Sequence, residues 1–95
     1  MIPERQIIKY KRAHDDHLNA AARDRRYDSI HTAALRAAFE GPFHAEGVAF
    51  ANWMDACNAV GYQIMDEIQA GVRPPMSIAE YLAMLPPLVL PGEPA

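Results

Sequence analysis

The chain contains a single cysteine, Cys57, so it can form neither an internal disulfide bond nor a metal site built on paired cysteines. It has no long apolar run either, since no stretch approaches the roughly 20 apolar residues that cross a bilayer. No hydrophobic signal segment precedes Lys9. These absences argue against a secreted disulfide scaffold and a membrane-spanning protein. We therefore expect a cytoplasmic protein with no membrane partner.

Sequence motifs for catalysis are also missing. The glycines inside the chain are isolated, so there is no phosphate-binding loop, and neither a serine elbow nor a zinc-binding helix motif is present. Asp55, Asp66 and Glu67 could be considered as paired carboxylates for acid–base chemistry. They fall among solvent-facing polar positions of a helix, which favours a solvated face. The sequence predicts no enzyme and no cofactor.

Positive charge is scarce beyond residue 28, where Arg36 and Arg73 are outnumbered by seven acidic residues. The first 28 residues are net positive, but the whole chain carries a formal net charge of −3. This balance argues against nucleic acid as the main partner. The cluster of Arg23, Arg25 and Arg26 with Tyr27 could still contact nucleic acid by charge and stacking, although it also suits the negative end of a helix dipole.

The length of 95 residues limits the chain to one small domain with a thin core. Hydrophobic residues make up 51% of it, many of them alanine, which favours helix but buries little area. Periodicity and caps predict helices over residues 3–26, 29–39, 45–70 and 78–85. Asp28 or Ser29 would cap the second helix, and Ser77 with Glu80 matches a capping box.

The predicted fold is all-α, with a central antiparallel hairpin formed by the second and third helices. A polar N-terminal helix (residues 1–26) precedes the hairpin and a short C-terminal helix, which together form the core (27–87). A flexible proline-rich tail (88–95) follows. Glycine at position 61 inside a helix costs about 1 kcal/mol relative to alanine, which indicates close approach of another helix. The predicted core side chains are Ile30, Leu35, Phe39, Phe50, Trp53, Cys57, Ile64 and Ile68.

Four groups of residues are candidates for a functional site. His14 and His17 could supply half of a metal site, although two solvated residues on a polar helix fit the pattern as well. Cys57 lies on an apolar helix face, where burial would make the thiol inert. Phe43, beside the turn before the third helix, is either part of the core or an exposed anchor for a partner. Arg23 and Arg26 are the charged candidates for an interaction surface.

One stretch of the chain resembles small proteins and C-terminal domains encoded in the tail regions of tailed bacteriophages and prophages. The similarity covers about Tyr27 to Pro87. It is carried by Tyr27-Asp28-Ser29-Ile30, Ala33-Ala34-Leu35, Glu46-Gly47-Val48-Ala49, Trp53-Met54-Asp55 and Tyr62.

The resemblance implies a non-enzymatic interaction or tail-assembly protein in the cytoplasm of a bacterial host. Its partner would be another protein, either a phage tail component or a second copy of the chain. The alternative hypothesis is a metal-binding or small regulatory helical protein that uses His14 and His17.

Overall fold

The computed structural model describes residues 4–92. Within that range all regular structure is helical, which confirms the predicted all-α class. The elements are α1 (Glu4–Asp24), α2 (Ile30–Leu35), the 3₁₀ helix η1 (Arg36–Ala38), α3 (His44–Gln69) and α4 (Ile78–Ala83). The predicted first residue of the first helix, Pro3, lies outside the described residues. No helix between residues 4 and 92 is long and apolar enough to cross a membrane.

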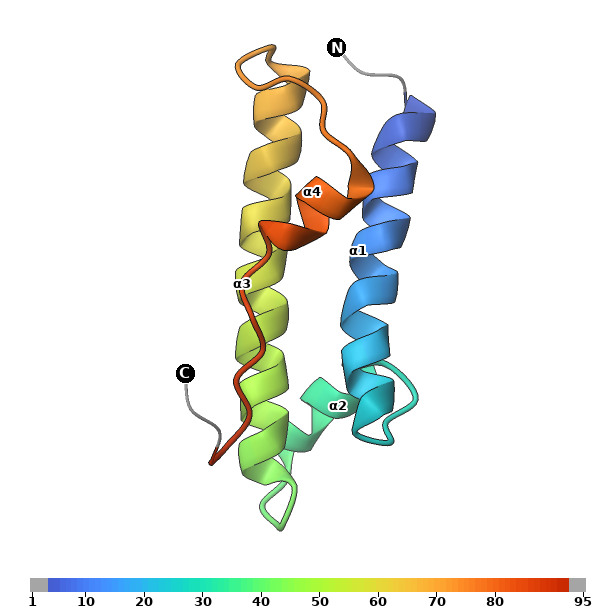
Figure 1. The fold of residues 1–95 in the computed structure, drawn as a ribbon. Coiled ribbons are helices and arrows are strands. Elements are labelled where there is room, and N and C mark those ends of the chain that lie inside the picture. The colour runs from blue at the N-terminus through green and yellow to red at the C-terminus, as the bar shows by residue number, and fades with distance from the viewer. Residues whose placement is uncertain (1–3, 93–95) are drawn as a thin grey trace.

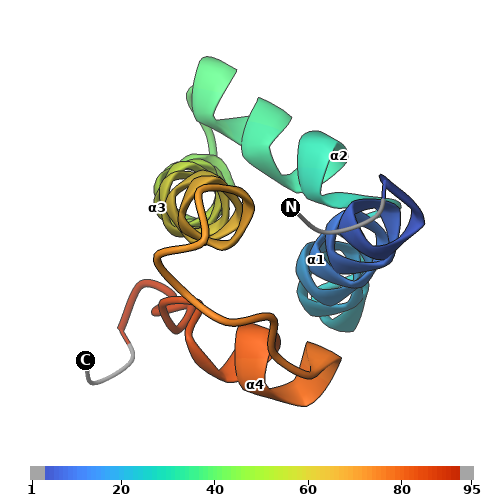
Figure 2. The same ribbon diagram turned by 90° about the horizontal axis from the view of Figure 1, so that it is seen from above.

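The two long helices, α1 and α3, run antiparallel along the long axis of the molecule (Figure 1). The molecule measures 46 × 24 × 20 Å. Viewed from above, α2 and α4 lie on opposite sides of this pair (Figure 2). The segment formed by α2 and η1 packs against the beginning of α3, so the second and third helices are in contact as predicted, but α2 crosses α3 rather than lying along it (Figure 2). The long antiparallel partner of α3, however, is α1.

The helix boundaries follow from local hydrogen bonds. The Ser29 side chain accepts a bond from the backbone N–H of Thr32 and caps α2, and Ser77 and Glu80 form the predicted capping box of α4. Gly71, with a φ of 78°, follows the end of α3 as expected. Arg26 takes the same left-handed conformation after α1, with a φ of 72°, at a position where glycine is usual.

The first helix is part of the core. The side chains of Tyr10, His14, Leu18 and Ala22 are buried at four-residue steps along α1. Tyr10 also donates a hydrogen bond to the carbonyl of Met76 and accepts one from its backbone N–H. The division between a polar helix (1–26) and a separate core (27–87) therefore does not describe the packing.

Two predicted core residues, Leu35 and Phe39, are instead exposed, by 55% and 51%. Ile30 and Ala33 form the buried face of α2. Leu35 is five residues beyond Ile30, roughly 140° around the helix, so it points to the other side. The chain then tightens into η1, and Phe39 follows it in an extended conformation. The other six predicted core residues are buried: Ile30, Phe50, Trp53, Cys57, Ile64 and Ile68.

The segment after α4 packs along α3 rather than forming a flexible tail (Figure 1). The indole Nε1–H of Trp53 donates a 2.7 Å hydrogen bond to the carbonyl of Pro86, and Leu85 and Leu90 are buried. The prediction for the tail (88–95) was therefore wrong at its beginning, because Leu90 is buried in the core and Leu88 packs against it. Its last residues, 93–95, lie outside the described range.

Candidate functional site

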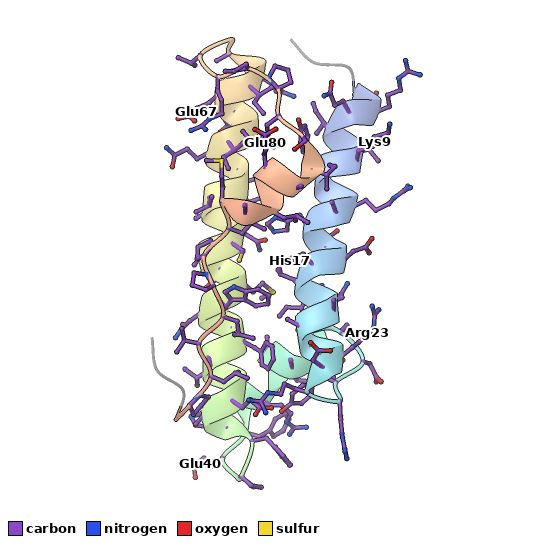
Figure 3. The ribbon with its side chains drawn as sticks, viewed as in Figure 1. Lys9, His17, Arg23, Glu40, Glu67 and Glu80 are labelled. Atoms are coloured by element: carbon purple, nitrogen blue, oxygen red, sulfur yellow. The ribbon has the colours of Figure 1, made fainter. Side chains whose placement is uncertain are left out.

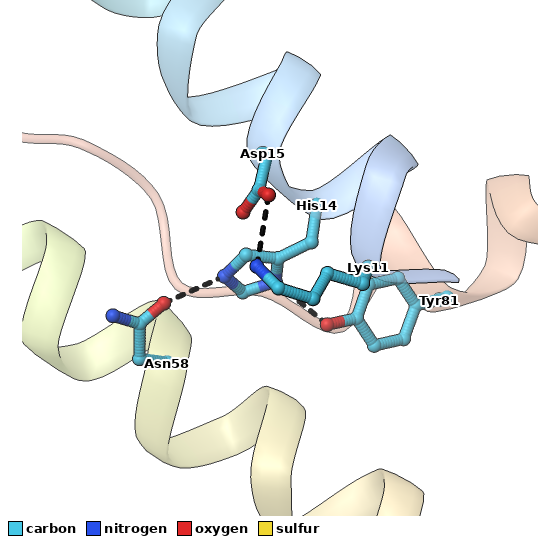
Figure 4. Close-up of polar contacts among 5 residues, drawn as sticks. All are labelled: Lys11, His14, Asp15, Asn58 and Tyr81. Atoms are coloured by element: carbon cyan, nitrogen blue, oxygen red, sulfur yellow. Dashed lines mark hydrogen bonds and ion pairs between the residues drawn. The ribbon is translucent and has the colours of Figure 1, made fainter. Parts of the chain in front are cut away.

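His14 joins three helices through hydrogen bonds of both its ring nitrogens (Figure 4). Its Nδ1 lies 2.6 Å from the hydroxyl oxygen of Tyr81 on α4, and its Nε2 lies 2.8 Å from Oδ1 of Asn58 on α3. His14 is only 7% exposed. The interpretation of this histidine as a solvated residue is wrong, because α1 turns it inward between Tyr10 and Leu18.

Donor and acceptor chemistry assigns the protons in this cluster. An amide oxygen can only accept, so His14 Nε2 carries the ring proton and donates it to Oδ1 of Asn58. With its one proton on Nε2, the ring accepts at Nδ1, and the Tyr81 hydroxyl is the donor of that bond. Burial raises the pKa of Tyr81 to about 12, so its hydroxyl keeps its proton at neutral pH.

Gly61 makes room for this cluster, as the sequence predicted for a close approach. A Cβ atom at position 61 would lie 2.6 Å from the hydroxyl oxygen of Tyr81 and 3.2 Å from Cε1 of His14. What approaches α3 here is therefore a pair of side chains rather than the backbone of another helix. Any larger residue at this position would push both rings away.

A cavity of about 380 Å³ lies beside the cluster, between α1 and α3. Its walls are largely apolar, and the hydrogen-bonded side chains of His14, Asn58 and Tyr81 are among its polar lining residues. Lys11 and Asp15 also line it, and they form a 2.9 Å ion pair with both side chains exposed. The apolar lining consists mainly of Ile7, Leu18, Ile30, Met54 and Met65.

The two histidines of the metal hypothesis have different surroundings. Both ring nitrogens of His14 are engaged in hydrogen bonds, so a metal ion could bind only if one of these bonds broke. His17 is directed from α1 toward α3 (Figure 3), and its ring centre lies 5.8 Å from that of Trp53. Among residues 4–92 no three His, Cys, Asp or Glu side chains are grouped to hold a metal ion.

Cys57 is fully buried on α3, as predicted. Its thiol points to the carbonyl of Pro86 at 3.8 Å. Burial raises the pKa of this thiol from an ordinary value of 9.0 to about 11. Because the thiolate is the reactive form, the sulfur is held in its unreactive state.

We expect Cys57 in the folded protein to react with 5,5′-dithiobis(2-nitrobenzoate) at pH 8 at least about 100-fold more slowly than in denaturant, since its thiolate fraction is that much smaller. The thiolate that the reagent releases absorbs at 412 nm, so the absorbance there measures the reaction. Because Cys57 is the single cysteine of the chain, the whole signal comes from it. The folded state should also lose stability as the pH rises from 9.0 toward about 11, because the unfolded thiol ionises first. Equal rates with and without denaturant would contradict the burial.

The three predicted interaction residues lie at one end of the molecule. Phe43, directly before α3, is 57% exposed, which favours the interpretation as an anchor. Arg23 and Arg26 are exposed at the end of α1, and antiparallel packing brings that end close to the beginning of α3. A 2.9 Å hydrogen bond from the Tyr27 hydroxyl to Glu46 connects the segment after α1 with the beginning of α3. Figure 3 shows Arg23 toward the same end as Glu40.

Leu35 and Phe39 add to the apolar surface at this end. The guanidinium carbon of Arg36 lies 4.8 Å from the ring centre of Phe39, a cation–π contact on an exposed side chain. We refer to Leu35, Phe39 and Phe43 as the apolar end. Sequence reasoning missed the first two because a leucine and a phenylalanine beside a helical pattern are usually buried.

Comparison with protein-family models, curated proteins and solved structures finds no match to this chain.

Proposed function

We propose that this chain is a non-enzymatic interaction protein of bacteriophage or prophage origin. It acts in the bacterial cytoplasm, in the assembly of a tail structure, and uses the apolar end as its binding surface. The observation that carries the proposal is the exposure of three large apolar side chains, Leu35, Phe39 and Phe43, by 55%, 51% and 57%. These three side chains fall within residues 35–43, and exposed apolar surface of this kind is typical of protein-binding sites.

The residues near the apolar end indicate the chemistry of the partner's surface. Arg23 and Arg26 at the end of α1 place positive charge near the apolar end. Aromatic residues and arginines are the side chains that most often carry the binding energy of a protein interface. The partner surface would therefore have an apolar pocket with acidic side chains around it. The resemblance to proteins of phage tail regions supports a tail component as that partner.

The proposal is tested with the variant Phe43→Asp, which places a charge on the apolar end. We expect it to weaken binding to a purified tail protein encoded beside the gene by about 30-fold, the effect of losing an interface anchor. Biolayer interferometry measures the affinity, and sedimentation velocity measures self-association in the same samples. Val72→Asp is the matched control, because Val72 is 76% exposed and follows α3 at the opposite end of the molecule.

The possible results separate the hypotheses. Loss of tail-protein binding in Phe43→Asp, with normal binding in Val72→Asp, supports the proposal. Self-association lost in the same variant would identify a second copy of the chain as the partner. Neighbouring genes of metabolic function, or equal affinity of both variants and wild type for the tail proteins, would reject a role in tail assembly.

A further inference from the structure

We propose that the cavity between α1 and α3 is a binding site for a small uncharged molecule with an apolar body and one hydrogen-bond acceptor. The site is separate from the apolar end, so it does not depend on the proposed assembly function. The cavity volume of about 380 Å³ falls within the usual range for small-molecule sites, roughly 300–1,000 Å³.

The walls of the cavity favour an apolar body. Ile7 and Leu18 line it from α1, and Met54 and Met65 line it from α3. An apolar ligand would release the water that otherwise contacts these side chains. The two methionines can also adjust their shape to a ligand, because the unbranched thioether side chain has several low-energy conformations.

The hydrogen-bond cluster supplies one donor for the ligand. Oδ1 of Asn58 accepts the proton of His14 Nε2, which leaves both N–H groups of the Asn58 amide on its other side (Figure 4). Asn58 lines the cavity, and no other described residue accepts from its amide nitrogen. His14 and Tyr81 use their own donors within the cluster. Within the cluster, the amide of Asn58 is therefore the group that would meet an acceptor on a ligand, such as a carbonyl oxygen.

The charges around the cavity favour an uncharged ligand. The charged side chains of the lining, Lys11 and Asp15, neutralise one another in an ion pair at 2.9 Å. The remaining titratable side chains of the lining are His14, within the cluster, the exposed His31, and three tyrosines. A ligand with a net charge would lose hydration on entering the apolar walls without gaining an opposite charge in return.

The probes are acetophenone and ethylbenzene, which share an apolar ring and differ in one carbonyl oxygen. Two-dimensional ¹H–¹⁵N NMR follows the titration of the full chain with each. We expect acetophenone to bind with a dissociation constant of about 1 mM, typical for so small a ligand, and to shift the backbone amides of Met54, Gly61 and Met65. The side-chain amide protons of Asn58 should move downfield with acetophenone and not with ethylbenzene.

Two kinds of variant test the assignment. Asn58→Asp keeps the oxygen that accepts from His14 and removes the amide donor, so acetophenone should bind about fivefold more weakly while ethylbenzene changes less than twofold. Met54→Trp and Ile7→Trp fill the cavity from opposite walls and should each weaken both probes at least tenfold. Met84→Trp, outside the cavity lining, is the matched control and should bind both probes like wild type.

The proposal is overturned if neither probe shifts the cavity amides, or if the filling variants that remain folded bind as tightly as wild type. An equal loss of both probes in Asn58→Asp, without a downfield shift of the Asn58 amide in wild type, would overturn the assignment of the donor. Loss in the filling variants together with a loss specific to acetophenone in Asn58→Asp supports the whole proposal.

Discussion

Replacing Trp53 with alanine is expected to lower the free energy of unfolding by about 3–5 kcal/mol, the usual effect of truncating a buried tryptophan. Trp53 is 6% exposed, and its ring makes an edge-on contact with Phe50, with the ring centres 6.4 Å apart. Its indole N–H also donates a hydrogen bond to the carbonyl of Pro86. The substitution therefore removes apolar contacts inside the core and the hydrogen bond that attaches the C-terminal segment to α3.

Urea denaturation followed by circular dichroism measures the effect. A domain of this size has little stability to spare, so Trp53→Ala should be partly or fully unfolded at 37 °C. Trp53→Phe separates the two contributions, because it keeps an aromatic ring and removes the N–H donor, and the lost bond should cost about 1 kcal/mol. Tyr62→Ala, on the same helix and 72% exposed, is the control and should change stability by less than about 0.5 kcal/mol. A near-normal midpoint for Trp53→Ala would place Trp53 outside the core.

The elements that the sequence predicts well are those set by local chemistry. The apolar positions from Phe50 to Ile68 recur at three- and four-residue steps, and they define α3 to within one residue at each end. The capping box at Ser77 and Glu80 is likewise a contact between residues three apart. Such features depend on neighbours along the chain, which a sequence displays directly.

The His14 cluster could not be found in this way, because its partners are distant in sequence. Asn58 is 44 residues away from His14, and Tyr81 is 67 residues away. The buried face of α1 consists of residues four apart: Tyr10, His14, Leu18 and Ala22. In the sequence the polar run from His14 to His17 interrupts this pattern and makes it hard to recognise. Histidine is usually read as a polar interruption of such a stripe, although its ring can be buried where both nitrogens find partners. The four-residue spacing was the available signal.

The packing of η1, and of α2 beside it, depends on a close contact at Gly47. The helical pattern predicts α3 through this position but says nothing of what lies against it. In the structure Gly47 is buried, and a Cβ atom there would lie 2.4 Å from the backbone nitrogen of Ala37 and 2.6 Å from the carbonyl carbon of Arg36. The backbone of η1 therefore rests directly on α3, which only glycine allows.

The variant Gly47→Ala should consequently destabilise the protein by about 2–3 kcal/mol, the usual result of overpacking a tight contact. Helix propensity alone predicts the opposite sign, since alanine in place of glycine in an open helix stabilises by about 1 kcal/mol. The clash involves backbone atoms of η1, which cannot rotate away as a side chain can. Relief requires η1 and the neighbouring α2 to move off α3.

Thermal and urea denaturation of Gly47→Ala and of Ala59→Gly measures the effects of overpacking and of helix propensity on the same helix. Ala59 is exposed on α3, so Ala59→Gly reports propensity alone and should lower stability by about 1 kcal/mol. Amide hydrogen exchange adds a local measurement, because displacement of α2 and η1 should speed exchange in residues 33–39 more than in residues 57–68. A rise in the midpoint of Gly47→Ala would mean that propensity prevails, and that η1 does not lie against α3 at this position.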